Sequence, residues 1–167
     1  MVDIAMGKAN LTYYIFEGVL AGTVNGRFVH IFTYSGGGSG YNPAHRKATN
    51  FLRDSQATNN PYRTGQLTNE ARNIRGGPIP PGKYIIKKPS NRDGSKAARL
   101  EPINPVTFFK RTGRDGGFLI HGRGPKGSDG CLVPVDPSEF QRLMDGLEKD
   151  DGGTLWVLET MAGDMFA

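Results

Sequence analysis

An Asn-Gly pair, Asn25-Gly26, stands between two apolar runs and places the strongest local constraint on the fold. Both central residues of a two-residue type I′ turn need positive φ, and Asn-Gly adopts that conformation readily. The flanking segments VLAGTV and RFVHIFTY are rich in β-branched and aromatic residues, which favour strands. The pair therefore predicts a β-hairpin within residues 11–34.

Turn-forming residues recur along the whole chain and limit the other elements to short ones. The 167 residues include 24 glycines and 11 prolines, which favours short strands over a helical bundle. No low-complexity linker divides the chain, so we expect one domain over residues 1–167. Further strands are predicted at 83–87, 106–113, 117–122, 131–135 and 154–159. The sequence thus predicts a mostly β (α+β) fold.

One helix is clearly marked, at about 137–149. Asp136 is a favourable N-cap, and Pro137 suits the first helical position. The apolar side chains of this segment have the i, i+3, i+4, i+7 spacing of a buried stripe: Phe140, Leu143, Met144 and Leu147. A second, short helix is predicted at 44–54, and the polar stretch 55–77 is expected to be a surface excursion.

Charge and apolar content restrict the partners and the place of synthesis. The net charge of +5 favours anionic partners such as cell-wall polymer, but no dense Lys/Arg tract indicates nucleic acid. No apolar run reaches the roughly 18 residues of a membrane span, and the first residues lack a signal-peptide pattern. We therefore expect a chain made in the cytoplasm, with no membrane span and no cleaved leader.

The single cysteine, Cys131, follows the segment FLIHGRGPKGSDG and is the main candidate for chemistry. A thiol attacks a carbonyl carbon as thiolate, so a catalytic cysteine needs a base or a positive environment. His121 ends one apolar strand, and Cys131 opens the next after a glycine-rich loop. Neighbouring strands lie about 4.8 Å apart, so the thiol and the imidazole come within hydrogen-bonding reach. Gly130 leaves room for a substrate carbonyl, and the amides of Gly130 and Cys131 are candidate oxyanion donors.

Other interpretations of this segment stand beside the catalytic one. Cys131 can be a core residue and His121 a strand-end histidine, because free cysteine is among the most buried residue types. The stretch GRGPKGS has the frame of a phosphate-binding loop, but Ser128 replaces its lysine and no helix follows. Neither a CxxC nor an HExxH pair is present, so no metal and no cofactor are predicted.

In the catalytic interpretation, the positive charges of Arg123 and Lys126 favour a thiolate at Cys131 and attract a carboxylate-bearing substrate.

Two segments resemble a known enzyme family. Ile120-His121-Gly122 followed by Ser128-Asp129-Gly130-Cys131 resembles the signature of the YkuD-type L,D-transpeptidases. The stretch GPIPPGKYII resembles the Pro-x-Gly-x-Tyr/Phe segment upstream of their site. The match is closer to a divergent branch, antibacterial effectors of the type VI secretion system, which carry a segment like Tyr34-Ser35-Gly36. The resemblance covers roughly residues 30–160.

This resemblance implies a β-sandwich catalytic domain that acts on peptidoglycan without a cofactor. In the family, a cysteine attacks the bond between meso-diaminopimelate and the terminal D-alanine of a tetrapeptide stem. Water or an amine then resolves the thioester. By position, Cys131 is the nucleophile, His121 the general base, and the Gly122 carbonyl an orienter of the imidazole. The residues implied in oxyanion and substrate binding are Ser128, Asp129, Gly130, Gly122 and Arg123.

The chain also departs from the family pattern. The spacer between His121 and Ser128 is shorter, which implies a trimmed lid over the site. Asp129 stands where the family has a second histidine, and Val133 where it has Asn or Arg. Loss of the polar residue at position 133 favours L,D-carboxypeptidase cleavage over cross-link formation.

The resemblance further implies an antibacterial toxin that is secreted without a signal peptide and acts in the periplasm of a target bacterium. Its expected partners are tetrapeptide stems, a type VI secretion delivery component and a periplasmic immunity protein. The alternative is a basic, non-catalytic wall-binding module with the same fold. An NlpC-like endopeptidase is disfavoured, because in that class the cysteine precedes the histidine and begins a helix.

Overall fold

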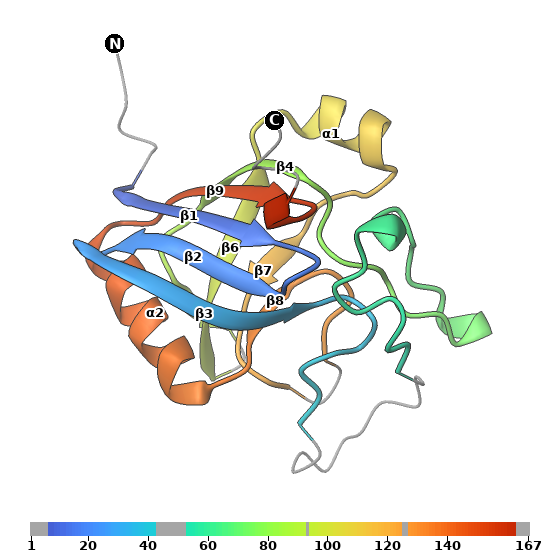
Figure 1. Ribbon diagram of the computed structural model, residues 1–167, viewed down its shortest axis with the longest axis horizontal. Helices are drawn as coiled ribbons and strands as arrows, with labels where there is room; N and C mark the ends of the chain where they lie inside the picture. Colours follow the sequence, from blue (N-terminus) through green and yellow to red (C-terminus); the bar gives the residue numbers. More distant parts are fainter. Residues whose placement is uncertain (1–6, 43–52, 93, 125–126, 163–167) are drawn as a thin grey trace.

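The computed structural model describes residues 7–42, 53–92, 94–124 and 127–162. Within these residues, nine strands form one sheet in the order β4-β9-β1-β2-β3-β8-β7-β6-β5. A further pairing of β4 with β6 closes eight of the strands into a barrel-like ring (Figure 1). The strands are β1 (Ala9–Tyr14), β2 (Val19–Val24), β3 (Arg27–Ser35), β4 (Gly82–Ile86), β5 (Ser90–Arg92), β6 (Ser95–Pro102), β7 (Phe118–Ile120), β8 (Leu132–Pro134) and β9 (Gly153–Leu158).

The mostly β prediction is confirmed, but the strand pairing differs from the expected β-sandwich. A sandwich has two separate sheets, whereas here the ladder continues from β4 through β9 in one direction and through β6 in the other. Tyr84 in β4 illustrates the closure, because it pairs with Leu155 of β9 on one side and with Pro102 of β6 on the other. The closing strand β6 and its hairpin partner β5 were not predicted, since their charged and small residues lack a strand-like apolar alternation.

The predicted hairpin is confirmed at Asn25-Gly26. These two residues have φ values of 51° and 73°, as a type I′ turn requires. They join β2 to β3, whose register begins with Val24 opposite Arg27. β1 lies antiparallel to β2 and parallel to β9, so the N-terminal strands and the last strand form one continuous part of the ring.

The predicted C-terminal helix is α2 (Pro137–Lys149). The Asp136 side chain caps it by accepting a hydrogen bond from the Ser138 amide at 2.8 Å. Leu143, Met144 and Leu147 are buried against the sheet, and Phe140 is partly buried beside them, as the apolar spacing predicted. Figure 1 shows α2 along one side of the barrel, opposite the excursion that contains residues 53–77.

The segment predicted as a strand at 106–113 is instead a helix, α1 (Pro105–Thr112). Its aromatic and β-branched residues suggested a strand, but the ends decide the conformation. Pro105 occupies the first turn, and Gly113 ends the helix with its amide bonded to the Phe109 carbonyl. Phe108 is the buried residue of this helix, and its ring meets those of Tyr84 and Phe118 edge to face.

The 55–77 excursion is largely exposed, as expected, and contains 3₁₀ turns at Pro61–Arg63 and Glu70–Arg72. Its last residues are not surface residues, however, because positions 75–80 are buried. The helix expected at 44–54 falls almost entirely outside the described residues, as does Lys126. Neither helix that the described ranges contain is long and apolar enough to cross a membrane.

Candidate active site

Strands β7 and β8 lie parallel, with His121 directly after β7 and Cys131 directly before β8. Their register pairs Ile120 with Leu132, and both of these side chains are fully buried in the barrel. The His121 amide continues the ladder by donating to the Leu132 carbonyl at 3.0 Å. His121 therefore adjoins one residue of the Ile120–Leu132 pair, and Cys131 adjoins the other.

The Cys131 thiol is only partly exposed. Its Sγ accepts a hydrogen bond from the Leu119 amide at 3.4 Å. Burial raises the pKa of the thiol; the Leu119 hydrogen bond and the charges of Arg92 and Arg114 oppose that rise, and Asp129 adds to it. Because burial dominates, the resting group is a neutral thiol.

The His121 ring is held by its own backbone neighbour. Nδ1 lies 2.6 Å from the Gly122 carbonyl oxygen, and since that oxygen only accepts, Nδ1 carries the proton. This leaves Nε2 as the basic nitrogen. Burial lowers the pKa of His121, the Gly122 hydrogen bond opposes this, and Arg92 lowers it further, so the imidazole is neutral at pH 7.

In the part of the chain that the structure describes, the thiol and the imidazole are not hydrogen-bonded to one another. Among the described residues, the hydrogen-bond partner of the thiol is the Leu119 amide, and that of the imidazole is the Gly122 carbonyl. Catalytic hydrogen bonds are often long or unformed without substrate. The arrangement combines a neutral base and a neutral nucleophile.

Ser128 shapes the turn in front of Cys131. Its side chain is buried, and its Oγ accepts from the Gly36 amide at 3.0 Å and from the Gly130 amide at 3.1 Å. The same hydroxyl donates to the Cys131 carbonyl at 2.5 Å. The Gly130 amide is thus directed to Ser128 and away from an oxyanion. The Cys131 amide, by contrast, has no acceptor among the described residues.

Asp129 anchors the same turn to the end of the 55–77 excursion. One carboxylate oxygen lies 3.0 Å from Nε of Arg75 and accepts from the Gly76 amide at 2.8 Å. The Arg75 side chain is 1% exposed, so this ion pair lies largely away from solvent. Arg114 adds a second link, because it donates to the carbonyls of Asp129 at 2.6 Å and Thr64 at 2.8 Å. These contacts hold the turn in place.

Gly130 is the residue at which the turn admits no side chain. Its φ is 137°, and an added Cβ would lie 2.5 Å from the Phe118 ring and 2.8 Å from Nη2 of Arg114. The side chain of Arg114 also stacks over Phe118, with Cζ 5.2 Å from the ring centroid. The glycine therefore lets the turn pass close over this buried pair.

The remaining candidates lie at the other end of the loop. Gly122 packs near Phe140 of α2, where an added Cβ would lie 3.3 Å from the ring. Arg123 is exposed and donates to the Tyr41 carbonyl at 3.2 Å, so it faces the loop after β3 and not the thiol. The described residues contain no group of three or more His, Cys, Asp or Glu side chains that could hold a metal ion.

Comparison with known proteins gives a likeness in fold only. No family profile matches the chain, and no curated protein is significantly similar to it. A solved structure of the helical cell shape determining protein Pgp2 from Campylobacter jejuni, a point mutant, is similar at 13% identity with a TM-score of 0.49. The match covers 95% of this chain and 51% of the other, so the chain spans about half the length of that protein.

Sequence reasoning did not identify Arg75, Arg92 and Arg114 as part of the site. Arg75 and Arg114 are buried, whereas arginine is rarely buried unless it is paired, and their partners lie far away in the sequence. Arg92 belongs to the hairpin that was not predicted. Only the Asp-Gly pair at 93–94, a known hairpin signal, pointed to that element.

Proposed function

We propose that this chain is a cysteine-dependent peptidoglycan hydrolase, an L,D-carboxypeptidase that removes the terminal D-alanine after meso-diaminopimelate. The observation that supports this most is the parallel pairing of β7 with β8, because His121 directly follows the one strand and Cys131 directly precedes the other. The hydrogen bond from His121 Nδ1 to the Gly122 carbonyl leaves Nε2 as the basic nitrogen of that pair. The motif resemblance supplies the substrate class.

The first half of the reaction forms a thioester. His121 Nε2 takes the thiol proton while Sγ attacks the carbonyl carbon of diaminopimelate, so a C–S bond forms and the carbonyl oxygen becomes an oxyanion. The Cys131 amide is the donor available to that oxyanion. The imidazolium then returns the proton to the nitrogen of D-alanine as the C–N bond breaks.

The second half releases the shortened stem. Water attacks the thioester carbonyl, His121 takes one of its protons, and the thiolate leaves and is reprotonated. A D-amino acid in place of water gives exchange, and the amine of a second stem gives L,D-transpeptidation. The charge of Arg92 acts on both His121 and Cys131, and a cation there suits a substrate with a terminal carboxylate.

The biological setting belongs to the same proposal. The chain is a type VI secretion effector that is made in the cytoplasm, passes to a target bacterium with a delivery component, and acts in the target's periplasm. Its producer is protected because the substrate lies across the inner membrane, and an immunity protein in the periplasm protects it from returning toxin.

One observation favours a second candidate, a non-catalytic wall-binding module. The thiol is largely buried with a raised pKa, and it contacts an amide and not the imidazole. An inert core cysteine has the same properties. In that case the net charge of +5 favours binding of the anionic polymer, and Cys131 has no chemical role.

Incubation of the pure protein with disaccharide-tetrapeptides, followed by mass analysis, separates the two functions. The proposal predicts loss of D-alanine by the native chain, and loss of that activity in Cys131→Ala and His121→Ala. Full activity in Cys131→Ala excludes the cysteine mechanism. Binding of the polymer without any cleavage by the native chain favours the wall-binding module.

A further inference from the structure

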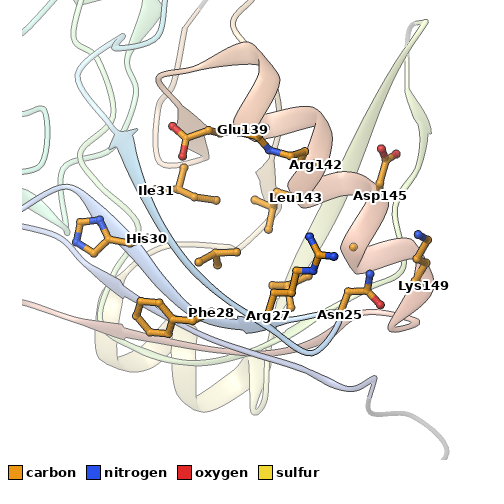
Figure 2. A pocket seen from close by; sticks show the side chains of 13 residues that line it. Asn25, Arg27, Phe28, His30, Ile31, Glu139, Arg142, Leu143, Asp145 and Lys149 are labelled. Atoms are coloured by element: carbon orange, nitrogen blue, oxygen red, sulfur yellow. The ribbon is translucent and has the colours of Figure 1, made fainter.

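Two hollows outside the reacting pair differ in whether acidic side chains stand among their described lining residues. The larger, about 520 Å³, lies between β3 and α2 (Figure 2). Its walls carry Arg27, Arg142 and Lys149, but also Glu139 and Asp145, so its charges largely offset one another. The second, about 420 Å³, lies beside the loop that follows His121. Among the described residues that line it, none is acidic, and Arg53 and Arg123 are the charged ones.

The two arginines of the second hollow converge on one atom. Arg53 donates to the Tyr41 carbonyl oxygen at 3.4 Å, and Arg123 donates to the same oxygen at 3.2 Å. Arg53 also stacks over the Tyr41 ring, with Cζ 4.6 Å from its centroid. Like charges held this close repel each other, and an anion between them relieves the repulsion. Each guanidinium keeps further N–H donors for such an anion.

No salt bridge within the described part of the chain involves Arg53 or Arg123. Asp54, next in sequence to Arg53, is bound by Arg63 at 3.0 Å. The hydroxyls of Ser39 and Thr58 donate to the Gly36 carbonyl and so fix the wall of the hollow. The hollow is therefore lined by cationic and hydroxyl side chains, and hydrogen bonds to the Gly36 carbonyl hold the loop that forms its wall.

The hollow adjoins the reacting groups through β8. Val133 lies two residues beyond Cys131, and an added Cβ at Gly40 would lie 2.6 Å from Val133. Gly40 and Tyr41 line the hollow, and Tyr41 bridges to Gly124 in the loop after β7. Two residues of extended strand span about 6.6 Å. The hollow therefore lies within a few residues' length of the carbonyl of a peptide that is attacked by Cys131.

We propose that Arg53 and Arg123 form a subsite for a carboxylate on the acyl side of the cleaved bond in the peptidoglycan stem. This inference rests on the proposed function and names the part of the substrate that the second hollow recognises. Stems that differ only in amidation of the diaminopimelate or the glutamate carboxylate distinguish the two carboxylates that can occupy it.

The test is a comparison of kcat/KM for Arg53→Gln, Arg123→Gln and the native chain on free-acid and singly amidated stems. With the free acid, each substitution should raise KM about tenfold or more with little change in kcat, because a charge-assisted contact is lost. On the stem amidated at the recognised carboxylate, the native chain should be equally weak and the substitutions should add almost nothing. Arg27→Gln, in the other hollow, is the matched control and should leave both values unchanged.

The same loss on free and amidated stems overturns the subsite, even if cysteine-dependent cleavage is intact. If no cleavage is detected, calorimetric binding of the free-acid and amidated tripeptide products to the same variants still decides the matter. A preference for the free acid that disappears in Arg123→Gln supports the subsite, and the absence of that preference refutes it.

Discussion

Arg75 and Asp129 form an ion pair, with 3.0 Å between Nε and Oδ1, directly beneath the turn that presents Cys131. The Arg75 side chain is 1% exposed and that of Asp129 is 34% exposed, so the pair joins a buried cation to a partly solvated anion. The sequence resemblance implied that Asp129 binds substrate. Its contacts show that it holds the turn against residues 75 and 76, and its part in substrate binding stays a prediction.

Asp129→Asn should destabilise the fold by about 2 kcal/mol. Asparagine can still accept from the Gly76 amide, but Arg75 loses its counter-charge in a buried position. Breaking a fully buried pair costs about 3–5 kcal/mol, and the partial exposure of Asp129 reduces that figure. Urea denaturation measures the change. Glu101→Gln, which breaks the exposed pair with Arg99, is the control and should cost less than about 1 kcal/mol.

The same substitution should lower the pKa of Cys131. The negative charge of Asp129 disfavours the thiolate, so removing it makes ionisation easier, although burial still raises the pKa most. The rate of alkylation by iodoacetamide, measured against pH, should have its midpoint at lower pH in Asp129→Asn than in the native chain. An unchanged or higher midpoint contradicts the electrostatic part of the account, whatever the effect on stability.

Gly130→Ala should abolish the folded site, whereas Gly124→Ala should be tolerated. At Gly130 the φ of 137° and the Phe118 and Arg114 contacts leave no space for a methyl group. At Gly124, a Cβ meets nothing within 4 Å. We expect Gly130→Ala to lose about 3 kcal/mol or more, and Gly124→Ala less than about 1 kcal/mol. Thermal unfolding of both variants checks the contrast, and similar losses in the two would show that this turn is not closely packed.

Activity should rise with pH through a midpoint below 6.5 and fall only in the alkaline range. Burial lowers the pKa of His121, so this base stays mostly neutral at pH 6.5, the usual pKa of a histidine. Burial raises the pKa of Cys131, which moves the alkaline limb of the activity profile to higher pH. The limbs of a kcat/KM profile report the pair as a unit. An acid limb at or above 6.5 contradicts a neutral resting imidazole.

His121 should also make stability depend on pH. Its folded pKa is lowered, so between that value and about 6.5 the unfolded chain binds more protons than the native one. The free energy of unfolding is therefore unaffected by the protonation of His121 above about pH 6.5 and decreases as the pH falls through this window. His121→Gln should flatten that part of the stability curve measured by urea denaturation, and an unaltered slope would contradict the assignment.

Local signals explain what the sequence could predict of the fold. The hairpin at Asn25-Gly26 and the capped helix from Pro137 are specified by residues next to one another, and both are confirmed. The segment from Pro105 was wrongly predicted because its composition favours a strand while its end residues favour a helix. Ring closure through β6 depends on pairing with β4, which no local pattern encodes.

In the candidate site, too, the features set by nearby residues could be predicted, and those set by distant residues could not. The glycine-rich sequence between His121 and Cys131 predicts that the two flanking strands are neighbours, and β7 and β8 are paired. The anchoring contacts come from far away, since Gly76 and Asp129 lie 53 residues apart and Arg114 reaches Thr64 across 50. Nothing in the local sequence marks Arg75 as a buried partner. Contacts of that range are set by the tertiary fold.

Detection of a covalent intermediate on Cys131 tests the central claim most directly. Native chain mixed with a tetrapeptide stem, quenched in acid within the first turnovers and examined by intact mass, should carry an adduct of the stem minus D-alanine. Peptide mapping should place that adduct on Cys131, within residues 118–134. Cys131→Ala should show neither adduct nor product. Release of D-alanine by Cys131→Ala at the native rate, or an adduct on another residue, would contradict the account.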